Sequence, residues 1–377
     1  MKLELTPEQR AARSEFRAFA QAEIAPFADR WDREEAIPRE LIDKLAGRGW
    51  LGANVPPEHG GPGLDMVSYG LLTEEIGKAC SSTRSLLTVH DMACQAILRW
   101  GSRAQRDHWL PKLSCGEILG AFALTEPQAG SDAMGVLTTA EKDGDGYVIN
   151  GRKKWITFAQ IAGLYLTFLK CDGKPTAFLI ERSTPGVRVE PIHGVLGTRA
   201  SLLAEVFFDN CRVPAENMVG RVGFGVSHVM AATLEHGRYS VACGSVGIAQ
   251  ACLDACLRHA REREQFGQPI FEHQLVRAMI SDMIVQVRAA RLMCLRAGYL
   301  RQINDPGAFM ETMAAKYLAS TVATRASTDA VQIHGASGYV EGSPIGRYFR
   351  DAKVMEIIEG STQIQQSTLA RFDFQEL

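Results

Sequence analysis

Residues 136–157, VLTTAEKDGDGYVINGRKKWIT, decide how this chain of 377 residues is organised. Short apolar or alternating runs in this stretch are broken by turn residues, a pattern that is typical of β-strands. The motifs DGDG at 143–146 and NG at 150–151 are strong hairpin signals, because these residues tolerate the positive φ of tight turns. The stretch therefore predicts strands joined by short turns.

The same kind of pattern continues on both sides of this stretch and ends near residue 222. Further short apolar or alternating runs lie at 119–125, 164–170, 176–181 and 204–208. Repeated short strands separated by turn signals predict a sheet structure of their own. We expect a middle β domain over residues 118–223, folded as a sandwich or barrel.

Residues 1–117 are predicted to be helical. Thr6 is followed by a proline and then by Gln9, a combination that caps and begins a helix running toward Arg30. A loop rich in glycine and proline, residues 56–63, precedes further helical patterns at 67–79, 84–100 and 103–113. We therefore expect an N-terminal α-helical domain.

Long helical patterns return after the β domain. They cover about 226–262, 271–300, 307–335, 345–356 and 361–372, with breaks at 302–307 and 335–346. Long helices separated by short breaks are typical of an up-and-down bundle. Residues 224–377 are therefore expected to form a C-terminal four-helix bundle, and the chain as a whole is expected to be α+β, in the order α, β, α.

The composition is that of an ordinary globular enzyme, with 46% hydrophobic residues, 22% charged residues and a net charge of −2. This balance gives no reason to expect a nucleic-acid partner or an anionic membrane surface. The N-terminus lacks the apolar core of a signal peptide, and no apolar run looks long enough to span a bilayer. We expect a cytoplasmic protein.

The nine cysteines, an odd number, fit a reducing cytoplasm better than a disulfide framework. Cys252 and Cys256 lie one helical turn apart, but no histidine pair or second cysteine pair completes a zinc pattern. We expect all nine to act as small apolar residues, with no bound metal.

A carboxylate near the C-terminus is the leading candidate for chemistry. Glu359 follows several apolar residues in the stretch 350–371, RDAKVMEIIEGSTQIQQSTLAR, and directly precedes Gly360. Apolar neighbours raise the pKa of a carboxyl group by disfavouring its charged form, and glycine lets another molecule approach the backbone closely. These properties suit a general base. The alternative is an ordinary glutamate at the start of a helix.

Two segments of the β domain could hold a planar cofactor that carries phosphate. The loop 124–132 offers the hydroxyls of Thr125 and Ser131 and the flexible Gly130, although a Thr-Glu-Pro sequence is more often only a turn. Trp155 and Thr157 lie two residues apart on a predicted strand, so their side chains should share one face. They would stack on a flat ring and bond its edge; the alternative for the tryptophan is a cross-strand aromatic pair.

Two turns of the C-terminal region could bind phosphate. Arg263 lies in a charged helix end before Phe266 and Gly267, and an arginine there could make a bidentate contact with a pyrophosphate. A charged helix end with a glycine cap is the commoner meaning of this pattern. The turn 332–338, QIHGASG, is either a phosphate cradle or a plain helix stop.

Taken together, these segments resemble the acyl-CoA dehydrogenase family along nearly the whole chain. The similar stretches follow the family's order: 124–132, 154–157, 207–220 (FFDNCRVPAENMVG), 263–274 (REQFGQPIFEHQ), 332–339 and 350–371. The resemblance implies a flavoprotein that carries FAD between the β domain and the C-terminal bundle, assembled as a homodimer or homotetramer.

The resemblance also implies a role for each matching residue. Thr125 would meet the pyrimidine edge of the flavin and Ser131 its pyrophosphate, while Trp155 would flank the ring and Thr157 would donate to its N5 edge. The same stretches would add cofactor contacts from Phe122, Leu124, Gly130, Ile156 and Gly335. A neighbouring subunit would hold the rest of FAD through Arg263, Phe266, His273, Gln274, Gln332 and Ala336. Ser361 and Gln363 would act from the same chain as Glu359.

Glu359 falls where many family members keep the catalytic base. Another branch keeps its base on the long helix, one residue before an arginine, and that position here is Gly237, before Arg238. Glu359 would take the α proton of an acyl thioester as hydride leaves the β carbon for flavin N5. Its backbone N–H and a ribityl hydroxyl would hold the enolate oxygen. Ser131, Arg238 and Gly360 are expected to contact the substrate.

The acyl group and its carrier are left open. Ile358, Ala336 and Phe158 depart from the commonest family pattern, and residues 355–361 with 80–85 resemble members that act on acyl carrier proteins in polyketide biosynthesis of hydroxymalonyl or methoxymalonyl extender units. The substrate is expected to be a small acyl thioester, either on CoA or as a hydroxylated three-carbon unit on a carrier protein. The expected electron acceptor is of the electron-transfer flavoprotein type.

Two other classes of function compete with this interpretation. A flavin monooxygenase or oxidase of this fold usually lacks a glutamate at the position of Glu359, so the sequence argues against it. A helical assembly protein that retains an unused flavin site is a non-enzymatic alternative. The intact motifs for the base and the flavin argue against that alternative as well.

Overall fold

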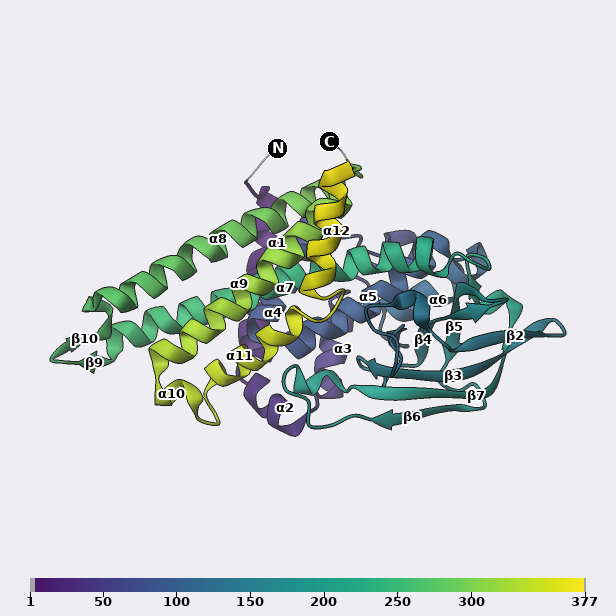
Figure 1. The fold of residues 1–377 in the computed structure, drawn as a ribbon, viewed down its shortest axis with the longest axis horizontal. Coiled ribbons are helices and arrows are strands. Elements are labelled where there is room, and N and C mark those ends of the chain that lie inside the picture. Colours follow the sequence, from purple (N-terminus) through teal and green to yellow (C-terminus); the bar gives the residue numbers. More distant parts are fainter. Residues whose placement is uncertain (1–3, 376–377) are drawn as a thin grey trace.

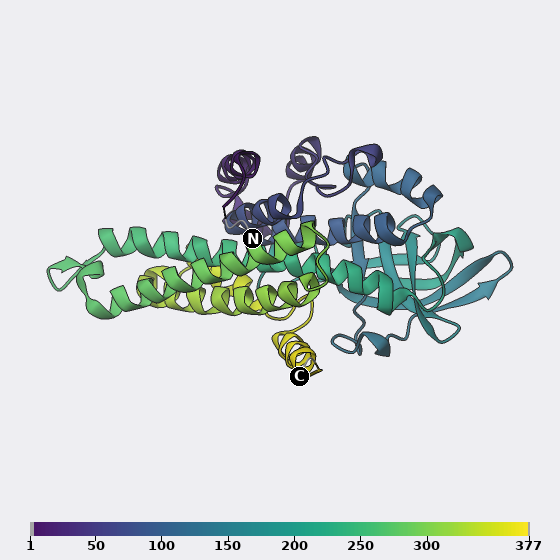
Figure 2. The ribbon, with the colours of Figure 1, turned by 90° about the horizontal axis from the view of Figure 1, so that it is seen from above.

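The computed structural model of the protein describes residues 4–375. Figure 1 shows the β-sheet at one end of the molecule and the long helices α7 (Ala231–Glu262), α8 (Gln274–Gln302) and α9 (Ala308–His334) running toward the other end. Seen from above in Figure 2, the N-terminal helices lie on one face of these long helices, and the C-terminal helix lies on the opposite face. The predicted α+β class and the order helix, sheet, helix are confirmed.

The N-terminal helices begin where the sequence places strong caps. Thr6 Oγ1 accepts a hydrogen bond from the Gln9 N–H at 3.2 Å, and the Gln9 side chain accepts one from the Thr6 N–H at 3.0 Å, so the predicted capping box is present. The predicted helix toward Arg30 is interrupted by a π-turn at Ala20–Ile24. The helices of this region are α1 (Pro7–Phe19), α2 (Ala28–Glu34), α3 (Arg39–Gly47), α4 (Met66–Ala79), α5 (Ser81–Trp100) and α6 (Arg103–Ser114).

Within the described residues, eight strands form one sheet with the order β6-β7-β3-β2-β4-β5-β8, and β1 pairs with β4. β1 and β2 run parallel to β4, and the other pairs are antiparallel. Two short edge strands, β6 and β8, lie outside the predicted runs. The strands are β1 (Gly120–Ala123), β2 (Thr139–Asp143), β3 (Gly146–Ile156), β4 (Leu164–Cys171), β5 (Lys174–Glu181), β6 (Val187–Pro191), β7 (Ala204–Pro214) and β8 (Met218–Val219).

One predicted hairpin is present and the other is wrong. The DGDG motif turns the chain between β2 and β3, with Asp143 paired to Gly146. The NG motif at 150–151 does not turn the chain, because β3 continues through it with a bulge against β7. Asn150 Oδ1 accepts the N–H of Asn210 at 2.8 Å, and a Cβ at Gly151 would lie 2.4 Å from Thr138 Oγ1. The glycine therefore serves a close strand contact and a bulge, not a hairpin.

The C-terminal region contains the long helices and the breaks predicted between them. A π-turn, Gly225–Met230, leads into α7, and the small hairpin of β9 (Glu264–Gln265) and β10 (Gln268–Pro269) separates α7 from α8. The chain then continues through α9 to α10 (Ala336–Tyr339), α11 (Pro344–Met355) and α12 (Thr362–Gln375). In Figure 1, the β9–β10 hairpin and α10 lie at the end of the bundle that is distant from the sheet.

The helical stretch Gly225–Glu262 at the centre of the molecule corrects the expectation that no apolar run reaches membrane-spanning length. It is long enough to cross a bilayer, and its most apolar window has a mean hydropathy of 1.4. However, 83% of that window is buried inside the protein. Its apolar side chains are used for packing in the core, as expected for the central helix of a bundle.

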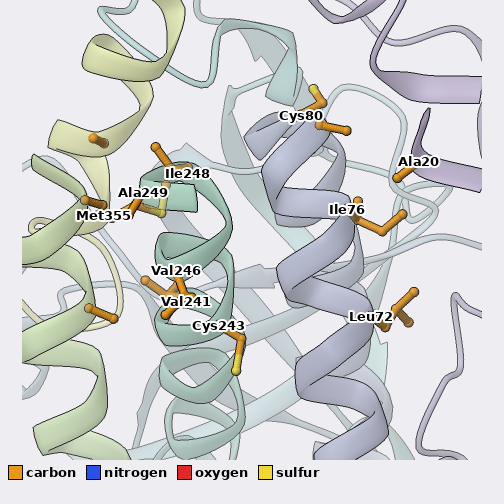
Figure 3. Packing of buried hydrophobic residues seen from close by; sticks show 14 of the residues in the cluster. Ala20, Leu72, Ile76, Cys80, Val241, Cys243, Val246, Ile248, Ala249 and Met355 are labelled. Carbon is orange, nitrogen blue, oxygen red and sulfur yellow. The ribbon is translucent and has the colours of Figure 1, made fainter. Parts of the chain in front are cut away.

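Helices α4 and α7 approach each other through glycines. Figure 3 shows the two helices side by side, with Leu72 and Ile76 of α4 directed toward Ala20. At the contact, a Cβ on Gly77 would lie 2.9 Å from the Cα of Gly244, closer than real Cβ atoms approach. The missing side chain lets the N-terminal helices sit directly on the central helix.

We predict that Gly77→Ala lowers the free energy of unfolding by about 1–3 kcal/mol, because the added methyl group overpacks the α4–α7 contact. Urea unfolding monitored by circular dichroism measures this change. Gly47→Ala is the matched control, since no atom lies within 4 Å of its added Cβ. Equal unfolding free energies for the two variants would contradict the proposed role of the Gly77 contact.

Candidate active site

Glu359 lies in the turn that joins α11 to α12, and its backbone is held in an uncommon conformation. Its φ is +57°, and that of Gly360 is +91°. A positive φ is uncommon for a residue with a side chain and persists only where the surrounding contacts fix it. The contacts around this turn are therefore part of the site.

Three side chains from three helices hold the two carbonyl groups of this turn. Arg238 Nε of α7 donates to the Glu359 oxygen at 3.0 Å, and Lys316 Nζ of α9 donates to the Gly360 oxygen at 2.7 Å. Gln365 Nε2 of α12 donates to both oxygens, at 3.1 and 3.2 Å. Lys316 and Gln365 were not identified from sequence. No pattern in the sequence sets these two residues apart, because their role depends on which helices meet at the turn.

The Glu359 carboxylate itself is left without a hydrogen-bond partner. Its Oε2 atom is buried and unpaired among the described residues, although the residue as a whole is half-buried. Burial raises the pKa of this carboxyl group to about 7, against the opposing fields of Arg238, Lys316 and Arg84. A carboxyl group with this pKa is matched to proton removal near neutral pH. The Glu359 backbone N–H is also unused by any other group in residues 4–375.

The central helix makes room for this carboxylate. A Cβ at Gly237 would lie 2.5 Å from Glu359 Oε2 and 2.8 Å from Met92 Sδ. Any side chain at position 237 would therefore occupy the space that the carboxylate of Glu359 fills. The alternative base position noted from sequence lies directly beside Glu359, but in this chain it holds only hydrogen.

The two predicted cofactor segments of the β domain are fixed to each other. The Lys154 N–H donates to the Thr125 oxygen at 2.8 Å. Beneath them, Lys153 Nζ donates to Glu126 Oε1 at 2.6 Å and to the Leu124 oxygen at 3.1 Å. This buried ion pair, which sequence reasoning missed, ties the loop at 124–132 to the end of β3.

The exposed surface of these segments suits a flat ligand. Trp155 is 49% exposed, and no atom would lie within 4 Å of a Cβ at Gly130. The hydroxyls of Thr125, Ser131 and Thr157 form no hydrogen bond with other described residues. The residues present therefore fit a ring system with a phosphate-bearing tail, which would take the indole face and the free hydroxyls.

Trp155 and Thr157 do not lie together on one regular strand, so the prediction that strand alternation puts them on one face is wrong. β3 ends at Ile156, Trp155 has a φ of +62°, and Thr157 lies in the following turn. The alternation of side chains along a regular strand therefore does not determine the directions of these two side chains. Ile156 and Leu124 are buried, and Phe122 packs against Phe168 with ring centroids 5.0 Å apart. The side chains of these three residues pack in the apolar cores under the predicted cofactor segments.

A loop of the β domain connects the cofactor segments to the helices that carry Glu359. Asp351 Oδ1 of α11 accepts the Thr198 N–H at 2.6 Å. Three residues on, the Ser201 oxygen accepts the Phe158 N–H at 2.8 Å. The loop thus joins α11 to the turn after β3, and Phe158 itself is fully buried.

A second set of predicted cofactor residues lies at the far end of the bundle. Phe266 on the β9–β10 hairpin is 94% exposed, and its ring meets that of His273 at 5.8 Å. The turns 263–267 and 332–336 lie near each other, because His259 and His334 stack with ring centroids 4.3 Å apart. Within one chain the structure does not bring this set to Glu359, as Figure 1 shows. The set consists of Arg263, Phe266, His273, Gln274, Gln332, Gly335 and Ala336. By contrast, Ser361 and Gln363 directly follow the Glu359 turn.

The described residues contain no group of three or more histidine, cysteine, aspartate or glutamate side chains that could hold a metal ion. Eight of the cysteines are buried and Cys115 is exposed. Burial raises the pKa of several of the thiols, among them Cys252, which disfavours the reactive thiolate form.

We predict that Lys153→Met lowers the free energy of unfolding at neutral pH by about 3–5 kcal/mol, because it leaves a buried carboxylate without its cation. Burial raises the pKa of Glu126, but Lys153 and hydrogen bonds from the Leu137 N–H and Thr138 lower it to about 2. Without Lys153 the pKa of Glu126 rises. The deficit should therefore shrink as pH falls toward about 4, where the carboxyl group of the variant is protonated.

Urea unfolding across this pH range measures the effect. Lys154→Met is the control, since Lys154 is a partly exposed neighbour that pairs with Glu205 at 3.0 Å. Equal losses in both variants, or a loss that does not depend on pH, would contradict the role of the buried pair.

Comparison with known proteins covers the whole chain. Profiles of the acyl-CoA dehydrogenase N-terminal, middle and C-terminal domains match residues 6–117, 121–211 and 223–372. The chain is 42% identical to a probable acyl-CoA dehydrogenase, YngJ, of Bacillus subtilis, with 98% of this chain and 99% of the relative covered. It is 38% identical to the mitochondrial short-chain specific acyl-CoA dehydrogenase of Mus musculus, with 98% and 90% covered.

Solved structures give the same result. A glutaryl-coenzyme A dehydrogenase in complex with glutaryl-CoA has a TM-score of 0.95 at 37% identity, with 99% of this chain and 97% of that chain covered. A structure described for the electron-transferring flavoprotein of Acidaminococcus fermentans has a TM-score of 0.95 at 36% identity, with 98% and 99% covered. FkbI, described for biosynthesis of the methoxymalonyl extender unit of a polyketide, has a TM-score of 0.88 at 36% identity, with 96% and 99% covered. This chain therefore belongs to the acyl-CoA dehydrogenase family.

Proposed function

We propose that this protein dehydrogenates a small acyl thioester and that Glu359 is the base that takes the α proton. The observation that carries the proposal is the buried, unpaired Oε2 atom of Glu359, whose carboxyl group has a pKa raised to about 7. The enzyme is a flavoprotein oxidoreductase that acts on CH–CH groups, as its family membership shows. FAD is the cofactor of the family, and when bound it supplies a ring nitrogen, N5, that accepts hydride.

The proposed step balances in protons and electrons. The α C–H bond breaks and its proton goes to a Glu359 carboxylate oxygen, while the β carbon gives up a hydride, which FAD would accept when bound, and the two carbons form a double bond. Negative charge develops on the thioester oxygen during proton removal, and the free N–H of Glu359 is a donor for that oxygen. The positive φ of Glu359 supports this role because it is a conformation that the surrounding contacts fix before substrate binds.

The cofactor would lie against the exposed part of the β domain. Trp155 would flank the ring, and the free hydroxyls of Thr125, Thr157 and Ser131 would bond its edge and the pyrophosphate. Ser361 and Gln363 follow Glu359 on the same chain. The remaining contacts would come from a second subunit, since the turns at 263–267 and 332–336 lie far from Glu359 in this one (Figure 1). This arrangement supports a dimer or tetramer with a shared site.

The acyl group is proposed to be short. Relatives over nearly the full length include short-chain specific and glutaryl-CoA dehydrogenases. The carrier is either CoA or an acyl carrier protein, and the similarity to FkbI supports the second alternative, a hydroxylated three-carbon unit on a carrier protein. The structural similarity to the Acidaminococcus protein supports an electron-transfer flavoprotein as the acceptor.

The two competing functions would give different results in tests of flavin reoxidation and FAD binding. Rapid reoxidation of the reduced flavin by air, with a hydroxylated product, would favour a monooxygenase. A colourless protein that rejects added FAD would favour an assembly role.

We predict that Glu359→Gln keeps bound FAD and slows anaerobic flavin reduction by roughly 10²–10⁴-fold or more, because the amide cannot accept the proton. Stopped-flow bleaching of the flavin, with a panel of CoA and carrier-protein thioesters, measures the rate. In the unmodified enzyme the rate should rise with pH through about 7, since only the ionised form of Glu359 acts as a base.

Glu356→Gln is the matched control. Glu356 lies three residues earlier, and its carboxylate pairs with Lys353 at 2.6 Å instead of facing the site. Full activity of Glu359→Gln, or an equal loss in both variants, would remove the assignment of the base.

We predict that Arg263→Ala weakens FAD retention and the dimer together, because a bidentate arginine–pyrophosphate contact would bridge two subunits. Ultrafiltration and analytical ultracentrifugation measure the bound FAD and the association. Arg261→Ala, two residues away on the exposed end of α7, is the control. A yellow dimer that Arg263→Ala leaves unaltered would argue against a shared site.

A further inference from the structure

The loop that joins β6 to β7, residues 192–203, reaches from the sheet to α11 (Figure 1). Two of its residues with side chains, Thr198 and Leu202, have φ values of +49° and +47°. The end of β3 and the turn after it contain two more such residues, Trp155 at +62° and Phe158 at +57°. Left-handed backbone is uncommon at residues with side chains and persists only where the surrounding contacts fix it. The contacts around the loop and the turn therefore decide whether both keep their shape.

The loop and the turn after β3 hold each other through hydrogen bonds. The Phe158 N–H donates to the Ser201 oxygen at 2.8 Å, and Gln160 Nε2 donates to the Leu203 oxygen at 2.9 Å. Both donors follow closely after Thr157, whose free hydroxyl is expected to meet the cofactor. A displacement of the loop would therefore remove the support of a predicted cofactor segment.

Residues of α11 fix the loop in turn. Asp351 Oδ1 accepts the Thr198 N–H at 2.6 Å, so this carboxylate holds a left-handed residue directly. Arg350 Nη1 donates to the Leu196 oxygen at 3.0 Å. A Cβ at Gly197 would lie 2.2 Å from the Arg350 oxygen, so the loop places bare backbone against the helix. The loop is therefore attached to the helix that precedes the proposed base.

The Asp351 carboxylate is enclosed, with 2% of the residue exposed. Burial raises the pKa of its carboxyl group to about 6, while Arg347 and the hydrogen bond from Thr198 oppose that shift. The group is therefore mostly ionised at pH 7, and hydrogen bonds to an ionised acceptor are roughly twice as strong as neutral ones. Such a bond can offset the strain of the left-handed residue that it holds.

We propose that Asp351 is a positioning residue, which fixes the loop and thereby keeps the turn after β3 in register with Glu359. On one side, Asp351 holds Thr198, and the loop holds Phe158 through Ser201. On the other side, α11 continues into the Glu359 turn. Register matters because the proton and the hydride leave neighbouring carbons of one substrate, and a misplacement of about 1 Å can slow a reaction roughly 10²-fold. The inference therefore rests on the proposed function.

A purely structural role for Asp351 makes a different prediction. If the carboxylate only added stability, its loss would lower the free energy of unfolding without changing catalysis by the folded holoenzyme. If it sets the register, its loss slows flavin reduction while the thioester still binds.

The kinetic test measures anaerobic flavin reduction in the FAD-loaded holoenzyme over a range of thioester concentrations. In Asp351→Ala the limiting rate should fall roughly 10–100-fold, because orientation is lost. The half-saturating concentration should change less than about 3-fold, because binding is kept. Asp351→Asn keeps an acceptor for the Thr198 N–H but loses the charge, so its limiting rate should lie between those of Asp351→Ala and the unmodified enzyme.

Asp29→Ala is the matched control. It removes a carboxylate that pairs with Arg347 of the same helix at 2.7 Å but that forms no hydrogen bond with the loop among residues 4–375. Its limiting rate should stay close to that of the unmodified enzyme.

A second test does not depend on turnover. Hydrogen exchange of the holoenzymes, followed by mass spectrometry, should be faster in residues 155–161 of Asp351→Ala than in the unmodified enzyme or Asp29→Ala. The Phe158 N–H, which the loop protects, should respond. If Asp351→Ala does not fold, Asp351→Asn carries both tests, with the same direction and a smaller effect.

Glycine at position 198 offers a rescue, because it takes a positive φ at little cost. Adding Thr198→Gly to Asp351→Ala should raise the limiting rate by about 3-fold or more. An unchanged limiting rate in Asp351→Ala, an equal loss in Asp29→Ala, or unchanged exchange at 155–161 overturns the inference while leaving the proposed function in place. Failure of every thioester to reduce the unmodified holoenzyme overturns the proposed function instead.

Discussion

The site depends on three donors that fix two backbone carbonyl groups, those of Glu359 and Gly360. Arg238, Lys316 and Gln365 come from α7, α9 and α12, so this one turn is where three helices of the bundle meet. Arg238 and Lys316 are charged, and charge-assisted hydrogen bonds to carbonyl groups are stronger than the neutral bonds that Gln365 donates. They hold the glutamate in a left-handed conformation that a free turn would leave. One carboxylate oxygen, Oε2, can therefore stay buried without a hydrogen-bond partner of its own.

Two of these donors, Arg238 and Lys316, also contribute to the electrostatic balance of the site. Burial alone would raise the pKa of Glu359 further, and the fields of Arg238, Lys316 and Arg84 bring it back toward neutrality. Burial in turn lowers the pKa of Lys316 to about 8, while the Glu359 carboxylate partly opposes that shift. Each charged group thus shifts the pKa of its neighbours. Burial raises the pKa of Glu359 and the three nearby positive charges lower it. The balance leaves this carboxyl group about half ionised near neutral pH.

The elements with a regular pattern were predicted well from sequence, and the irregular ones were not. Long apolar helices and the DGDG hairpin follow local rules of periodicity and turn chemistry. The NG motif at 150–151 failed because a strand partner with its own bulge decided its conformation, which no local signal reveals. Glu359 was identified from its neighbours in the chain. Lys316 and Gln365 could not be, because their role depends on which helices meet at the turn.

The bare position at Gly237 limits how many acids the space beside the turn after α11 can hold. A side chain there and the carboxylate of Glu359 would occupy the same volume. An acid at both places would force the Glu359 carboxylate to move and would add repulsion between like charges. This space therefore holds a single carboxylate, and in this chain Glu359 supplies it.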